Sequence, residues 1–134
     1  MKTRVVAATV IEKQGRFLFG RKGKDVPPYP NKWLILGGGM REGESIHEAL
    51  RREIREEAGI EIDDIEPLGF DEDTGIRKGE EVHFIFLQFM SRWKSGEPRP
   101  GDDIFELKWA DKSDIPGIDF SKPTVKLFRR IGFL

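Results

Sequence analysis

The chain has 134 residues, with 23 lysines and arginines against 24 aspartates and glutamates, and it contains no cysteine. One domain spanning residues 1–134 is expected from this length, a disulfide scaffold is excluded, and the net charge of -1 provides no general attraction for a nucleic acid polymer or a membrane surface. The N-terminal apolar run from Val5 to Ile11 is too short for a signal peptide or a membrane span, so we expect a cytoplasmic protein.

The first elements along the chain are those of a β-hairpin. Val5 to Glu12 is apolar and β-branched, Lys13 to Gly15 is typical of a turn, and Phe17 to Arg21 alternates as a strand does. The segment from Gly23 to Asn31 carries three prolines and is therefore expected as a loop. Leu34 to Leu36 then predicts a short aliphatic strand that leads into three consecutive glycines.

The glycines Gly37, Gly38 and Gly39 are expected to form a turn whose backbone passes close to a ligand, because residues without side chains leave room for one. The helix that follows offers its free N-terminal amides to anions nearby. A glycine triplet alone is more often a flexible turn. Ahead of an acidic helix, it predicts half of a site for a metal-bound diphosphate.

A helix of about four turns is expected next. Ser45 and Glu48 form an S-x-x-E capping box at its start, and Gly59 is placed to end it in the left-handed conformation. At about 100° per residue, one side of this helix carries an apolar arc that must face a core. The members of the arc are Ile46, Leu50 and Ile54.

Three glutamates of this helix lie where carboxylates are normally avoided. Glu57 falls inside the apolar arc, Glu53 lies beside it and Glu56 is a little further round. Burying an unpaired charge costs several kcal/mol, and like charges at this spacing repel unless a counter-ion intervenes. The ligands are oxygen only, which favours Mg2+ or Mn2+ over zinc.

The alternative is a solvated acidic face whose glutamates pair with arginines. That interpretation suits the outer side of the helix, where Arg51 and Arg55 are placed to pair with Glu48. It does not suit Glu53 and Glu57, which point toward the core side.

The rest of the chain alternates strands with polar connections and ends in a helix with Pro123 in its first turn. We expect a strand over Ile65 to Phe70, a turn over Thr74 to Gly79, a strand over Glu81 to Met90, a loop over Ser95 to Asp103, a strand over Glu106 to Ala110 and a helix over Ser121 to Ile131.

The pattern G-x5-E-x7-R-E-I-x-E-E-x-G-I resembles the signature of the Nudix hydrolases at every specified position. It comprises Gly38, Glu44, Arg52, Glu53, Ile54, Glu56, Glu57, Gly59 and Ile60. A chance match in a chain this short has odds of roughly one in a million. The resemblance implies a single domain with an α/β fold, an α/β/α sandwich whose mixed β-sheet lies between helices. It also implies metal-dependent cleavage of a phosphoanhydride bond in a nucleoside diphosphate-linked compound.

Site roles follow from the same resemblance. Glu53, Glu56 and Glu57 are similar in position to the family's metal ligands, and the carbonyl of Gly37 or Gly38 completes the metal shell. Glu44 binds a metal directly or through water. Arg52 orients Glu53, which is expected to act as the general base as well.

Substrate contacts outside the signature are expected from Arg21 above all, and from Arg4, Gly39 and Asp103. The arginines belong to the first hairpin and could hold phosphates, although solvated surface charge is the competing interpretation for each. Nudix enzymes often place an additional acidic residue, usually Glu, before the last strand. Here Asp102 and Asp103 stand there, and a turn role for one of them is equally open.

The substrate class is indicated mostly by the absence of residues that are typical of other Nudix subgroups. The region from Thr74 to Arg77 lacks the proline typical of ADP-ribose hydrolases, and Tyr29 is the only tyrosine, whereas dinucleoside polyphosphate hydrolases carry one after the signature. The chain looks most like the MutT-like, NudI-type branch. Hydrolysis of a nucleoside triphosphate to monophosphate and pyrophosphate by a monomer or homodimer is therefore expected. The alternatives are an ADP-ribose or nucleotide-sugar pyrophosphatase and a nucleotide-sensing module without catalysis.

Overall fold

The computed structural model describes residues 1–134 as seven strands and three helices. In chain order these are β1 (Lys2–Lys13), β2 (Arg16–Lys22), β3 (Trp33–Leu34), β4 (Leu36–Gly39), α1 (Ile46–Ala58), β5 (Glu61–Arg77), β6 (Glu80–Ser95), β7 (Ile104–Asp111), the 3-10 helix η1 (Lys112–Gly117) and α2 (Lys122–Ile131).

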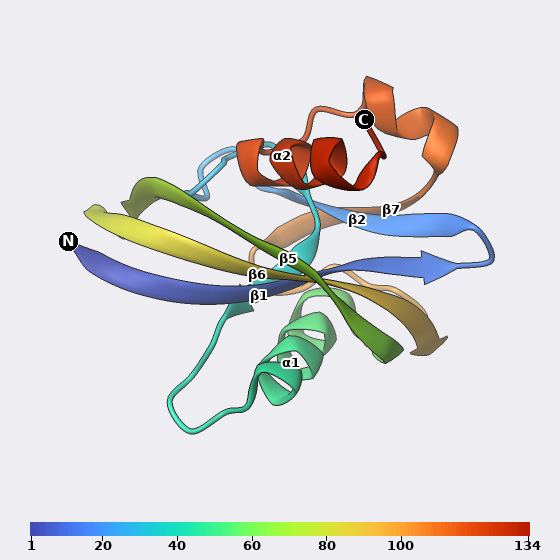
Figure 1. Cartoon of the computed structure of the whole chain (residues 1–134), viewed down its shortest axis with the longest axis horizontal. Coiled ribbons are helices and arrows are strands. Elements are labelled where there is room, and N and C mark those ends of the chain that lie inside the picture. Colours follow the sequence, from blue (N-terminus) through green and yellow to red (C-terminus); the bar gives the residue numbers. More distant parts are fainter.

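The strands form one mixed sheet in the order β3-β2-β1-β6-β5, with β4 also paired to β1 and β7 to β2. The pair β1–β6 is parallel, and all other pairs are antiparallel. Helix α1 covers one face of the sheet and α2 the other (Figure 1). The predicted α/β/α sandwich is therefore confirmed. No helix is both long and apolar enough to span a membrane.

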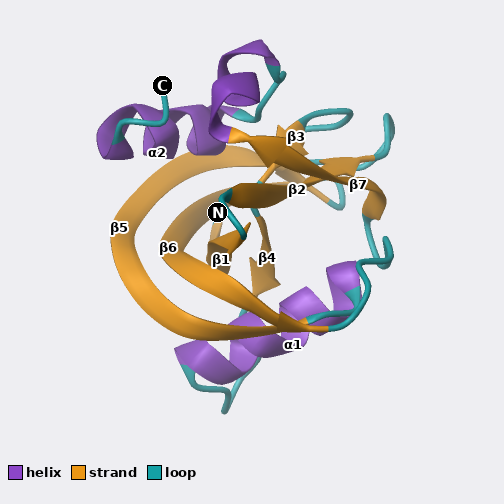
Figure 2. Cartoon of the chain, turned by 90° about the vertical axis from the view of Figure 1, so that its right-hand side faces the viewer, coloured by secondary structure: helices purple, strands orange, loops and turns teal.

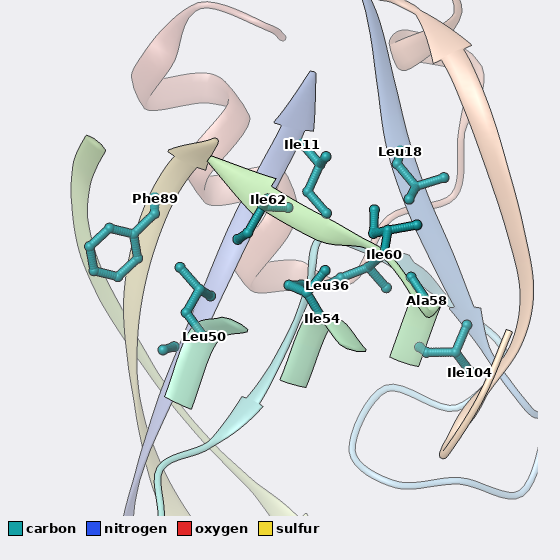
Figure 3. Close-up of a cluster of buried hydrophobic side chains, with 11 residues drawn as sticks. Ile11, Leu18, Leu36, Leu50, Ile54, Ala58, Ile60, Ile62, Phe89 and Ile104 are labelled. Atoms are coloured by element: carbon teal, nitrogen blue, oxygen red, sulfur yellow. The ribbon is translucent and has the colours of Figure 1, made fainter. Parts of the chain in front are cut away.

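Each face of the sheet has its own hydrophobic core, because successive side chains of a strand point to opposite sides. On β1, Ala7 and Ile11 join the cluster beneath α1 (Figure 3), whereas Ala8 and Val10 join the cluster beneath α2. Leu50 and Ile54 are fully buried under α1 as predicted, but Ile46 remains 39% exposed. The first turn of α1 therefore contributes little to the core, and the predicted apolar arc is shorter than expected.

Both predicted ends of α1 are confirmed. The Ser45 side chain and Glu48 form the reciprocal capping box, and Gly59 ends the helix with φ of 68°. The predicted pairing of Arg51 and Arg55 with Glu48 is wrong. Arg51 instead donates to the Ile62 carbonyl and Arg55 to the Glu61 carboxylate, since both acceptors lie on the strand that follows α1.

The hairpin of β5 and β6 is longer than predicted, and the expected turn over Thr74 to Gly79 is wrong. Thr74 to Arg77 continue β5 and pair with residues 80–83 of β6. Only Lys78 and Gly79 make the turn, with φ of 52° and 78°, the positive values that a two-residue hairpin turn requires. The hairpin curls around the rest of the sheet (Figure 2), and its tip carries Arg77 and Lys78.

The glycine triplet is a strand and not the predicted turn. Gly37, Gly38 and Gly39 belong to β4 and pair antiparallel with Ala8, Ala7 and Val6 of β1. The aliphatic strand expected over Leu34 to Leu36 is interrupted at Ile35, because β3 pairs with β2 and β4 pairs with β1. Residues without side chains are thus fixed in regular backbone at the edge of the site.

Candidate active site

A cavity of about 340 Å³ opens on the α2 side of the sheet. Its floor consists of alternate residues of the parallel pair β1–β6, in which Arg4 lies opposite Phe84, Val6 opposite Phe86 and Ala8 opposite Gln88. The β4 glycines, the Gly23–Asn31 loop, the tip of the β5–β6 hairpin and the segment before β7 supply the walls. Segments from the whole length of the chain therefore meet in one place.

The glycines of β4 let two glutamates of α1 reach this cavity. A Cβ atom on Gly38 would lie 2.3 Å from the Glu53 carboxylate, so a side chain there would displace that carboxylate. The backbone N–H of Gly37 donates to Glu57 Oε1 at 2.8 Å. Both carboxylates line the cavity. Because these β4 residues have no side chains, the carboxylates of Glu53 and Glu57 have room to lie at the cavity.

Three carboxylates converge beside the cavity, and two of them, Glu53 and Asp102, line it. Glu53, Glu56 and Asp102 each place one oxygen within 4.8 Å of the other two. Opposite ligands of an octahedral Mg2+ are about 4.2 Å apart, so the group fits a hard divalent cation with small adjustments. Asp103 lines the cavity but lies outside this group, and so does Glu57, whose carboxylate is held by Gly37.

Asp102 reaches the glutamates because its loop is tied to the end of α1. Gly101 N–H donates to the carbonyl of Glu57 at 3.0 Å, and a Cβ on Gly101 would lie 2.4 Å from the Glu56 carbonyl oxygen. Asp102 itself has φ of 51°, a conformation that aspartate tolerates better than most residues. The sequence leaves the choice between Asp102 and Asp103 open, and in the structure this conformation brings Asp102 into the group of three carboxylates.

Arg52 connects the acidic groups through five hydrogen bonds. Two go to Glu44 at 2.6 and 2.9 Å, one to Glu53 at 2.8 Å, one to Glu56 at 3.2 Å and one to the Gly39 carbonyl at 2.9 Å. Hydrogen bonds from Arg52 lower the pKa of Glu44 to about 2, and the same bonds raise the pKa of Arg52. The structure thus places Glu44 against Arg52, outside the group of three carboxylates.

Burial has the opposite effect on the two inner glutamates. Glu53 is 7% exposed and Glu57 is 4% exposed. Loss of hydration raises the pKa of Glu53 against the opposing influence of Arg52, and it raises the pKa of Glu57 well above the usual range of a carboxyl group. A divalent cation beside them would relieve this cost of burial.

Positive charge lines the cavity on the side of the β5–β6 hairpin tip. Arg4, Lys22, Arg77 and Lys78 all contribute to the lining. Burial lowers the pKa of Arg4, and the charge of Arg77 lowers it further. Burial likewise lowers the pKa of Lys22, whose Nζ donates to the Pro28 carbonyl at 3.1 Å. These cations provide a surface for an anionic ligand next to the carboxylates.

The structure does not bring Arg21 to the cavity. Its guanidinium pairs with Glu106 at 2.8 Å and donates to Asn31 at 3.3 Å. Lys22, the next residue of β2, points to the other side and lines the cavity. Arg77 and Lys78 were missed because the tip was assigned to a longer turn. The Lys78-Gly79 pair, typical of a two-residue hairpin turn, is the signal that could have placed them.

A family model described as NUDIX domain matches residues 1–130. The chain belongs to the Nudix family. Among curated Nudix relatives, nucleoside triphosphatase NudI of Escherichia coli strain K12 is 31% identical over the full length of both chains. The NudI of Enterobacter sp. strain 638 is 28% identical over the same extent.

Solved structures share the Nudix fold of this chain. The MutT NUDIX hydrolase from Burkholderia pseudomallei has a TM-score of 0.83 at 24% identity, covering 98% of this chain and 99% of its own. The NUDIX domain of Shewanella oneidensis NrtR, crystallised with ADP ribose, has a TM-score of 0.77 at 14% identity, covering 98% of this chain and 88% of its own.

Proposed function

We propose that this Nudix protein hydrolyses a nucleoside or deoxynucleoside triphosphate to the monophosphate and pyrophosphate, with Mg2+ bound by Glu53, Glu56 and Asp102. The observation that carries the proposal is a group of three converging carboxylates, two of which line the cavity, next to four cationic side chains that line it as well. The full-length similarity to proteins named nucleoside triphosphatase supports the choice of substrate.

The four cations favour a triphosphate over a single diphosphate bridge. A divalent cation neutralises part of the negative charge of two phosphate groups. Four further cationic side chains are then more than two phosphates need: Arg4, Lys22, Arg77 and Lys78. The side chains of Arg4, Arg77 and Lys78 make no hydrogen bond or ion pair within the protein, so their donors are available for phosphate oxygens. Lys22 is held at the rim by two proline carbonyls.

Hydrolysis needs a proton acceptor, charge stabilisation and a held substrate. When bound, Mg2+ would supply positive charge to the phosphate oxygens and make the attacking water more acidic. Glu53 accepts a proton from that water as the water oxygen forms a bond to the α phosphorus. The bond between the α and β phosphates then breaks, and its electron pair leaves with pyrophosphate. Arg52 keeps the Glu53 carboxylate in place at 2.8 Å.

A substrate panel tests the proposal. The wild-type protein is incubated with Mg2+ or Mn2+ and with ribo- and deoxyribonucleoside triphosphates, ADP-ribose and nucleotide sugars, and pyrophosphate and orthophosphate release are scored separately. Pyrophosphate from a triphosphate is the expected product. Cleavage of the diphosphate-linked compounds alone would assign a sugar or ADP-ribose pyrophosphatase instead. Tight binding without any product after long incubation would assign a sensor.

Replacing Arg52 by lysine is expected to lower kcat by about 10- to 100-fold with a smaller change in KM. A lysine has one charged centre and cannot reproduce the five directed bonds of the guanidinium, so the Glu53 carboxylate loses its orientation. Steady-state kinetics and a melting curve check this. Arg55→Lys on the same helix is the matched control, since Arg55 pairs with the exposed Glu61. Equal losses in both variants would contradict the role of Arg52.

A further inference from the structure

Beyond the phosphate-binding groups, the cavity floor carries an aromatic ring and an amide on one strand. Phe86 and Gln88 are alternate residues of β6, and both line the cavity. The Phe86 ring lies 18° from parallel to the ring of Phe84, with centroids 5.9 Å apart, which fixes its plane. Gln88 is only 2% exposed. A flat apolar surface next to a buried polar group is suited to a planar ring with polar edges.

The distance from the phosphate-binding end suits a nucleoside. Gly37 of β4 lies opposite Ala8, and Ala8 lies opposite Gln88 on the other side. Two strand spacings, about 10 Å, therefore separate Gln88 from the backbone that holds Glu57. A ribose between the two ends would span this gap. The floor residue between them is Ala8, whose small side chain leaves the space open.

Arg130 determines which way the Gln88 amide faces. Its Nη2 donates to Gln88 Oε1 at 2.7 Å, while Nη1 donates to Asp71 at 2.7 Å. Because a guanidinium has only donors, the amide atom next to it must be the oxygen. The Nε2 donor of Gln88 has no acceptor in the protein and remains accessible from the cavity. An oriented donor that remains accessible is thus left unpaired at the cavity floor.

The path of Arg130 to Gln88 depends on Gly69. This glycine lies opposite Gln88 on β5, and a Cβ there would lie 3.0 Å from Arg130 Nη2. A side chain at this position would therefore press against the guanidinium and force it to shift by a few tenths of an ångström. Asp71, two residues further along β5, accepts a hydrogen bond from the other guanidinium nitrogen, Nη1. The orientation of the Gln88 amide therefore depends on residues from three elements, β5, β6 and α2.

We propose that Gln88 selects the nucleobase by donating to a ring carbonyl oxygen of a base stacked on Phe86, with Arg130 as the positioning residue. This inference rests on the proposed nucleotide substrate. A base with a carbonyl at the contacted edge accepts from the Gln88 donor, whereas an amino group at that edge leaves two donors facing each other. Uracil is therefore preferred over cytosine, and hypoxanthine over adenine. In each pair the carbonyl base also carries an N–H at the adjacent ring nitrogen, where the amino base has a lone pair.

The test compares UTP with CTP and ITP with ATP for wild type and variants. We expect a wild-type preference of about tenfold in kcat/KM for the carbonyl member of each pair. Gln88→Glu, which replaces the free donor by an acceptor, should invert the ratio. Gln88→Met should bring it close to one. The other glutamine of the chain, Gln14, is exposed in the first hairpin turn, so Gln14→Glu is the matched control.

Binding measured apart from turnover separates this inference from the proposed function. Calorimetry with the non-hydrolysable α,β-methylene analogues of UTP and CTP gives the same ratio from dissociation constants, whether or not the protein cleaves either nucleotide. Arg130→Lys should reduce the ratio without an equal loss for both nucleotides, a pattern that general destabilisation would not produce. A wild-type preference for the amino member, or a Gln88→Glu ratio equal to that of wild type, would overturn the proposal.

Discussion

Replacing Glu53 by glutamine will lower kcat by about 100-fold or more, the range that loss of a general base produces. The amide keeps the size of the side chain in its confined place against Gly38, but it cannot accept a proton. The same change weakens the three-carboxylate group, so the Mg2+ concentration for half-maximal activity will rise. Steady-state kinetics over a Mg2+ titration measures both effects.

Glu66→Gln is the matched control, because Glu66 is an exposed carboxylate on β5 that does not line the cavity. The wild-type pH profile gives a second check. Since burial raises the pKa of Glu53 in the metal-free protein, protons should compete with Mg2+ for this carboxylate, and the Mg2+ concentration for half-maximal activity should rise as the pH falls. A Glu53→Gln variant that kept full turnover at saturating Mg2+ would remove Glu53 from the mechanism.

Replacing Glu57 by glutamine is expected to raise the melting temperature of the metal-free protein at pH 8. The pKa of Glu57 is raised well above its value in the unfolded chain by burial, so folding favours the protonated form. The stability that this group contributes is full below the unfolded pKa and is lost as pH rises through the folded pKa. Glutamine does not titrate, and its carbonyl can still accept the Gly37 N–H.

The measurement is a set of melting curves at pH 5 and pH 8, in EDTA and in Mg2+. A gain of 1 kcal/mol corresponds to roughly 3–5 °C in a domain of this size. The difference between variant and wild type should be largest at pH 8 in EDTA and should shrink at pH 5. Mg2+ should stabilise the wild type more than the variant. Identical melting temperatures of both proteins at pH 8 in EDTA would contradict the inference that the buried charge of Glu57 destabilises the metal-free protein.

Local features of the site could be predicted because neighbouring residues determine them. The capping box of Ser45 and the left-handed Gly59 depend only on the helix itself, and both are as expected. The contact of Arg52 with Glu53 is also within one helix. Helical spacing therefore placed the acidic face correctly relative to the core.

Features that depend on distant strands could not be read in the same way. The glycine triplet was expected as a turn because its partner, residues 6–8 of β1, lies far away in the sequence. Arg77 became a cavity residue through the register of β5 with β6, and Lys22 replaced Arg21 because a strand alternates its side chains. A shift of one residue in a strand exchanges the two faces, and local sequence does not fix that register.

The parallel pairing of β1 with β6 also has a consequence for how the domain is made. Arg4 meets Phe84 and Ala8 meets Gln88 only after most of the chain has been synthesised. Closing so long a loop costs entropy before any contact offsets it, which slows folding. Helix α1 therefore leaves the ribosome with its glutamates before the surface for the nucleotide exists. A ligand of this cavity could stabilise the finished domain but could not guide the folding of the nascent chain.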